Sequence, residues 1–196
     1  MVNEIDQNQV QTKAATIPQS ASQVYASGEL ERLFRATFFD SHHTVLVGGA
    51  SEPVYLPGHP HQICYSHDYF RSALHEIAHW CVAGAARRQQ EDYGYWYAPD
   101  GRSADQQAEF AQVEVYPQAL EALFCAACGH DFRVSLDNLN GDGGDEVAFA
   151  LKVKAKAERL LAEGLAERPA RWCEVLKAAY GREGVSLHHA LQSLFA

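Results

Sequence analysis

Apolar residues recur every three or four positions over most of the chain, and this spacing predicts a largely helical protein. Residues at that spacing share one face of a helix, and this face packs against the core. Leu74, Ile77 and Cys81 fall on one such face. Ser103 with Gln106 forms a capping-box pattern that marks where the next helix begins. The predicted helices cover residues 27–37, 68–90, 103–128, 146–164, 168–180 and 186–195.

Strand signals are fewer and shorter. Residues 43–49 (HTVLVGG) combine β-branched side chains, which favour strands, with a glycine pair that ends the run. Residues 51–66 hold three prolines and a glycine, so we expect an extended loop there that can include an edge strand. A further short strand is expected at 132–134. Together these patterns predict an α+β fold that is predominantly helical.

Composition and length predict how the chain is divided into an arm and a domain. Residues 1–22 are polar and show neither the helical nor the strand periodicity of apolar residues, so we expect a disordered or loosely attached arm. Residues 23–196 show no internal repeat, and their number suits a single domain. No apolar run is long enough for a membrane span, and no secretory pattern opens the chain. Five cysteines, an odd number, then favour reduced thiols and a cytoplasmic location.

The formal net charge of −9 limits the choice of binding partners. General nucleic-acid binding needs a basic face that displaces counterions, so direct binding to nucleic acid is not expected. An acidic protein suits instead a well-solvated surface, or a site that receives a cationic group.

The candidate chemistry centres on residues 75–79, whose sequence HEIAH fits the HExxH pattern. Residues four positions apart on a helix have Cβ atoms about 5–6 Å apart on the same face. His75 and His79 can therefore each reach one metal ion at about 2.0–2.1 Å. The full pattern is expected roughly 0.03 times by chance in a chain of this composition, so it is informative without being decisive. The alternative is a pair of ordinary surface histidines.

A usable metal site needs a third ligand, and the helix predicted at 103–128 offers Glu109, Glu114 and Glu121. Glu114 is the first choice because it lies between two valines, where a carboxylate is costly unless it is paired or binds a metal. Two chemistries suit such a site. With zinc, Glu76 acts as general base in hydrolysis, whereas with Fe(II) the ligands leave open positions for dioxygen. The spacing alone leaves both open.

Three segments that occur in one order give the chain a specific resemblance. HDYFRSALHEIAHWCVAGAARR (67–88), DYGYWYAPDGR (92–102) and VEVYPQALEALF (113–124) closely resemble the elongation factor P hydroxylase family. The similarity covers about residues 30–180. It implies a zincin-like metal-binding helix packed on a small sheet, and an iron- and oxygen-dependent hydroxylase. The implied partner and substrate is elongation factor P, at a lysine that has received a β-lysyl group.

The resemblance also implies the site residues. The metal ligands carried over are His75 and His79, with Glu114 as the carboxylate, and the implied ion is Fe(II), with zinc as its replacement. Glu76 has a catalytic role that stays open, because it can orient water or oxygen, or hold a ligand in position. The electron donor stays open too. Two alternative functions remain: a zinc metallopeptidase, and a non-catalytic, metal-stabilised protein-binding module.

Two further features each have a functional and a plain structural interpretation. The aromatic residues of 93–97 (YGYWY) either cover an alkyl-ammonium group through cation–π contacts or pack on the core. Cys125 and Cys128 form a single CxxC pair. Because a zinc knuckle needs a second pair, two packed core cysteines are the favoured interpretation.

Overall fold

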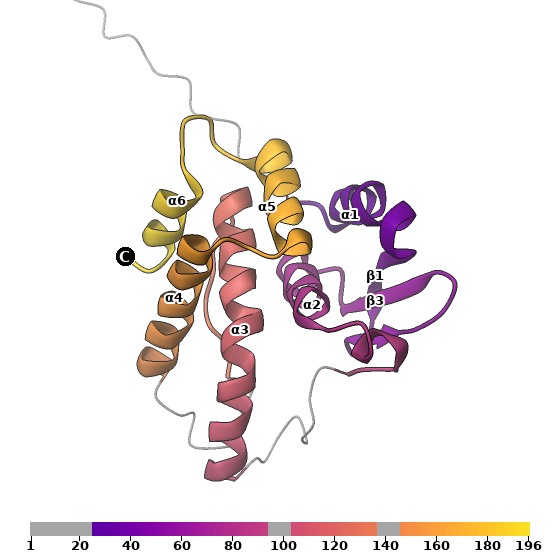
Figure 1. Cartoon of the computed structure of the whole chain (residues 1–196), viewed down its shortest axis with the longest axis horizontal. Helices are drawn as coiled ribbons and strands as arrows, with labels where there is room; N and C mark the ends of the chain where they lie inside the picture. Colours follow the sequence, from indigo (N-terminus) through magenta and orange to yellow (C-terminus); the bar gives the residue numbers. More distant parts are fainter. Residues whose placement is uncertain (1–24, 94–102, 137–145) are drawn as a thin grey trace, which may run out of the picture.

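The computed structural model describes residues 25–93, 103–136 and 146–196, which fold into helices beside a small sheet (Figure 1). This confirms the predicted α+β, predominantly helical fold. The predicted N-terminal arm and most of the aromatic loop lie outside the described residues, so both stay predictions, as does a domain boundary at residue 23. The elements are α1 (Ser27–His42), β1 (Thr44–Ala50), β2 (Val54–Leu56), β3 (His61–Ser66), α2 (Phe70–Val82), the short 3-10 helix η1 (Arg87–Gln89), α3 (Ala104–Cys128), α4 (Glu146–Glu163), α5 (Glu167–Tyr180) and α6 (Leu187–Leu194).

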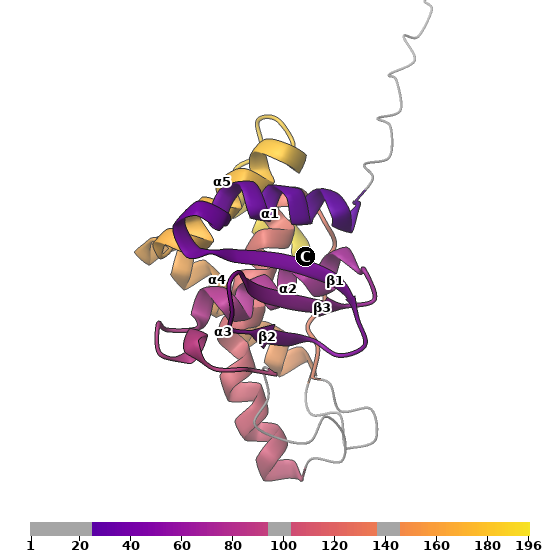
Figure 2. The ribbon, with the colours of Figure 1, turned by 90° about the vertical axis from the view of Figure 1, so that its right-hand side faces the viewer.

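The sheet has the strand order β1-β3-β2, with α1 packed against β1 and α2 packed against β3 (Figure 2). β1 and β3 are parallel, whereas β2 is antiparallel to β3. The edge strand expected within residues 51–66 is present as β2, but the extended loop expected over the rest is wrong, because the last six residues form the central strand. Ile63, Cys64 and Tyr65 are buried in succession. A strand covered on both faces lacks the alternation that identifies a strand from sequence. The strand predicted at 132–134 is also wrong.

α2 is shorter than its apolar pattern predicts, since it ends at Val82 rather than at residue 90. The guanidinium of Arg168, on α5, caps this end. It donates hydrogen bonds to the backbone carbonyls of Trp80, Cys81 and Ala83 at 2.7, 3.2 and 2.9 Å. The last carbonyls of a helix have no partner within it. A cation at this position donates hydrogen bonds to these carbonyls and also interacts favourably with the negative end of the helix dipole.

α3 is the central helix, packed against α2, α4, α5 and α6 (Figure 1). Its start confirms the predicted capping box, because Ser103 and Gln106 exchange hydrogen bonds between side chain and backbone. The helix continues through Pro117 to Cys128, and every residue of 117–128 is buried. Any polar side chain in that half must therefore find its partners inside the protein. No helix in the described part of the chain is long and apolar enough to cross a membrane.

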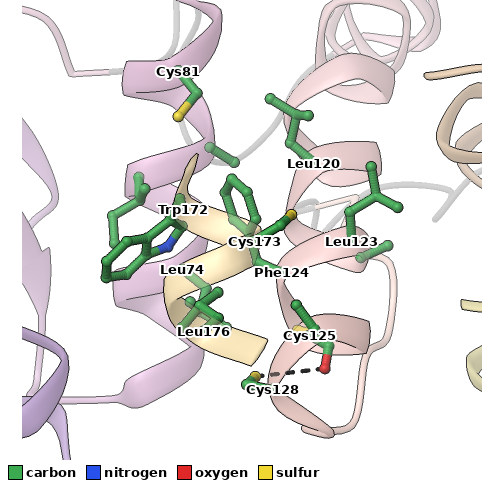
Figure 3. Close-up of a cluster of buried hydrophobic side chains, with 14 of the residues drawn as sticks. Leu74, Cys81, Leu120, Leu123, Phe124, Cys125, Cys128, Trp172, Cys173 and Leu176 are labelled. Carbon is green, nitrogen blue, oxygen red and sulfur yellow. Dashed lines mark hydrogen bonds between the residues drawn. The ribbon is translucent and has the colours of Figure 1, made fainter. Parts of the chain in front are cut away.

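Four of the five cysteines lie among apolar side chains of α2, α3 and α5 (Figure 3). Burial raises the pKa of the Cys81 thiol and of the Cys128 thiol to about 12, so both stay protonated at neutral pH. Cys128 donates a weak hydrogen bond to the backbone carbonyl of Cys125 at 3.5 Å. The CxxC pair is thus part of the packed core, in agreement with the favoured interpretation, and all five cysteines are free thiols.

Arg168→Ala is expected to lower the free energy of unfolding by about 2 kcal/mol, because the carbonyls at the end of α2 lose a charged donor. Chemical denaturation measures the difference. Arg159→Ala is the matched control, since its guanidinium pairs with Glu163 at 2.7 Å on the exposed surface of α4. Such pairs contribute about 0.5 kcal/mol or less. Equal losses of stability in the two variants would contradict the capping role of Arg168.

Candidate metal centre

Two histidines of α2 face a carboxylate of α3 where these helices pack together. The Nε2 atoms of His75 and His79, one helical turn apart, are separated by 3.0 Å. A Glu114 oxygen lies 3.3 Å from Nε2 of His79, and the other lies 3.8 Å from Nε2 of His75. One potential ligand atom from each residue lies within 4.8 Å of the other two. The structure thus brings together the three residues that the sequence suggested as metal ligands.

The three donors fit a divalent metal ion. Two nitrogens that each bind one ion at about 2.1 Å lie roughly 3 Å from each other, as these histidine nitrogens do. Two imidazoles with one carboxylate form a donor set that both iron and zinc accept. Glu114 has only 4% of its side chain exposed. Because a buried carboxylate needs a positive partner, a cation held by the three side chains would stabilise this arrangement.

The charges of the site show how a metal would compete with protons. Burial by itself lowers the pKa of His75, but its hydrogen bond to Glu121 and the charge of that carboxylate raise this pKa to about 10. Burial would raise the pKa of Glu114, yet His79 and His75 lower it to about 2. The raised pKa of His75 favours a proton on this imidazole in the metal-free site, while Glu114 stays ionised. A metal ion would need the nitrogen lone pair that this proton occupies.

Glu121, one of the alternative third ligands, occupies a different position. Its Oε2 atom accepts a hydrogen bond from Nδ1 of His75 at 2.8 Å, and its Oε1 atom accepts one from Nε of Arg71 at 2.7 Å. A carboxylate that holds the Nδ1 proton leaves the Nε2 lone pair available and fixes the ring. Arg71 gave no signal in the sequence, because its partner lies fifty positions away. The remaining alternative, Glu109, is exposed and lies outside the cluster.

Gln118 is a supporting residue that the sequence analysis missed. Its Nε2 atom donates to Glu114 at 3.3 Å and to the backbone carbonyl of Ser135 at 2.6 Å. Its Oε1 atom accepts from the backbone N–H of Ser135 at 3.0 Å. The spacing of Glu114, Gln118 and Glu121 is a usable signal, because steps of four and three form one polar stripe along an otherwise apolar helix. Gln118 therefore joins the cluster to the segment that follows α3.

A groove with a volume of about 460 Å³ opens beside the cluster. We call it the α2 groove, and its lining includes Tyr69, Arg71, Ser72, His75, Glu76 and Glu121. A much smaller cavity of about 30 Å³ lies next to His79. Glu76 borders both spaces and is not one of the three clustered ligands. Burial raises the pKa of its carboxyl group. The catalytic role suggested for Glu76 stays a prediction.

Comparison with known proteins identifies the family. Residues 33–190 match the family described as elongation factor P hydroxylase. The chain belongs to this family. A Haemophilus influenzae protein named elongation factor P lysine hydroxylase is 43% identical over 155 residues, covering 77% of this chain and 87% of that protein. The resemblance carried by three sequence segments is thus confirmed. The clustered histidines and Glu114 all lie within the range that matches the elongation factor P hydroxylase family.

Glu121→Gln is expected to weaken metal binding by this hydroxylase family member about tenfold or more, because Nδ1 of His75 loses a charged acceptor. Competition with a chelator for Zn²⁺ measures the affinity. Glu109→Gln removes an equivalent charge from the exposed part of the same helix and should leave the affinity unchanged. A Glu121→Gln variant that binds Zn²⁺ with wild-type affinity would show that this carboxylate does not support His75.

Metal binding is also expected to strengthen as the pH rises from about 6 to about 9. The reason is that His75, with its pKa raised to about 10 in the metal-free protein, must release a proton to bind the ion. Below that pKa, each pH unit increases the affinity by up to about tenfold. Calorimetric titration with Zn²⁺ in buffers of different ionisation enthalpy measures the protons released. An affinity independent of pH over this range would contradict the prediction.

Proposed function

We propose that this chain hydroxylates, with iron and dioxygen, the lysine of elongation factor P that carries a β-lysyl group. Family membership and the relative named elongation factor P lysine hydroxylase support the reaction and the protein substrate. The cluster of His75, His79 and Glu114 supports the metal chemistry. The observation that carries the proposal is that His75 belongs both to this cluster and to the wall of an open groove.

The roles of the clustered residues follow from their contacts. Fe(II) held by His75, His79 and Glu114 would supply activation of dioxygen, because two histidines and one carboxylate leave coordination positions open. The chain itself orients the donors. Glu121 accepts from Nδ1 of His75 and so turns its Nε2 atom toward the cluster. Gln118 donates to Glu114 and restrains that carboxylate beside the histidines.

The charge of the groove suits a lysine substrate. A lysine that carries a β-lysyl group bears its positive charges on the amines of that group, because its own ε-nitrogen has become an amide, and the carboxyl group of Glu76 lines the route to the cluster. Arg71 also lines the groove, but its guanidinium is already paired with Glu121 at 2.7 Å. The net charge of −9 adds a longer-range attraction for cations. These features favour a cationic substrate over an anionic one.

The proposal includes a cytoplasmic location, since five free thiols are typical of a reducing compartment. The proposal also distinguishes between the functions that would use the same three metal ligands. Membership of a hydroxylase family argues against the zinc metallopeptidase and against the non-catalytic binding module. Zinc is nonetheless an ion that the same donors would bind, so metal content alone does not identify the reaction.

The intact mass of elongation factor P tests the proposal. In cells that lack any other copy of this enzyme, co-expression of the chain should add one oxygen atom to the β-lysylated factor. His75→Ala should abolish the gain, and Glu114→Gln should reduce it by about tenfold or more, because each removes a metal donor. Glu109→Gln, on the same helix, should retain it. If the wild-type chain adds no oxygen, the proposed reaction is wrong; if Glu114→Gln keeps full activity, Glu114 is not a ligand.

A further inference from the structure

The carboxyl group of Glu76 stands out beside the cluster because it has no direct polar partner among the described residues. Among the described residues, none forms a hydrogen bond or salt bridge with its carboxylate, whereas the adjacent His75 and His79 are engaged by Glu114 and Glu121. The side chain borders the α2 groove and the small cavity beside it. A partly buried carboxylate without a partner is unfavourable, and an ammonium group bound beside it would relieve that cost.

Tyr69, at the N-cap of α2, lines the same groove with 63% of its surface exposed. The backbone holds it there in an unusual way. The preceding residues His67 and Asp68 both have φ of 55°, in the left-handed region that residues other than glycine rarely adopt. The His67 ring stacks on the Tyr69 ring with 5.5 Å between their centroids. The turn before α2 therefore presents an exposed aromatic ring to the groove.

Ser72 lies between Tyr69 and Glu76 in the sequence and lines the same groove. Tyr69 and Glu76 are seven positions apart, which corresponds to about 10 Å along a helix. A lysine side chain spans roughly 6 Å from Cα to Nζ. A plain lysine whose ammonium lies beside Glu76 therefore leaves much of this wall without contact. A lysine that is extended by an amino acid bearing a second amine would cover it.

We propose that Tyr69, Ser72 and Glu76 form a recognition surface that selects an aminoacylated, doubly cationic lysine over a plain lysine. The inference rests on the proposed function and adds the residues that read the substrate side chain. Glu76 pairs with the ammonium group nearer the cluster. The Tyr69 ring contacts the rest of the extended chain, by cation–π attraction and by packing on its methylene groups.

Arg71 does not oppose this assignment, although it lies on the same wall of the groove. Its guanidinium donates to Glu121 at 2.7 Å and to the backbone carbonyl of Arg133, and it lies 5.4 Å from the centre of the Phe132 ring. These contacts hold its positive charge against α3 and the segment after it. The charge available to a ligand in the groove is therefore that of Glu76.

The test compares binding of the purified full-length chain to unmodified and to β-lysylated elongation factor P. The wild-type chain should bind the β-lysylated form more tightly, by about fivefold or more. Tyr69→Ala should remove most of this preference, as expected from the loss of a cation–π contact. Tyr69→Phe keeps the ring and should retain the preference. Glu76→Gln should weaken the binding of both forms and reduce its dependence on salt concentration, because each form places an ammonium group beside this side chain.

Leu151→Ala is the matched control for Tyr69→Ala, because Leu151 is a large side chain that is 62% exposed on α4. It should bind both forms as the wild type does. Zinc content and the thermal midpoint of each variant establish that the fold and the cluster are intact. If the wild type adds oxygen but Tyr69→Ala keeps its preference and Glu76→Gln keeps its affinity, the recognition surface is wrong and the proposed function stands. If the wild type adds oxygen to neither form, the proposed function itself is wrong.

Discussion

The contact between α2 and the buried half of α3 is the constraint on which the rest of this structure depends. It brings His75 and His79 of one helix between Glu114 and Glu121 of the other. A buried charge that loses its partner costs several kcal/mol, so neither helix can hold these groups without the other. The interaction that allows the polar groups to be buried therefore also gathers the three side chains proposed as metal donors.

The position of α2 along α3 has to be held closely for this pairing to work. At the C-terminal end, Arg168 binds the last carbonyls of α2 and caps the helix. At the N-terminal end, the left-handed residues His67 and Asp68 turn the chain out of β3 and into the helix. The sheet supports the helix between these ends. A shift of one turn along α3 would separate His75 from Glu121.

Three glutamates lie near the same two histidines, and their surroundings separate their tasks. Glu114 is buried and faces the Nε2 atoms, which suits a metal ligand. Glu121 is equally buried but meets Nδ1 of His75 and Arg71, which suits a positioning residue. Glu76 has no such partner and borders the groove, where a substrate would arrive. The same side-chain chemistry is thus suited to three different roles, because burial and neighbours differ.

Local patterns along the chain were enough to predict its helical character, the histidine pair and the capping box at Ser103. These features depend on residues within one or two helical turns, and their spacing is visible in the chain. The apolar neighbours of Glu114 also pointed to it as a ligand. Only the tertiary structure separated the tasks of Glu114 and Glu121, because both lie on one stripe of α3 and differ in which imidazole nitrogen they meet. It also decided that β3 is central and that α2 ends early, because the segments that cover β3 and the guanidinium of Arg168 come from distant parts of the chain.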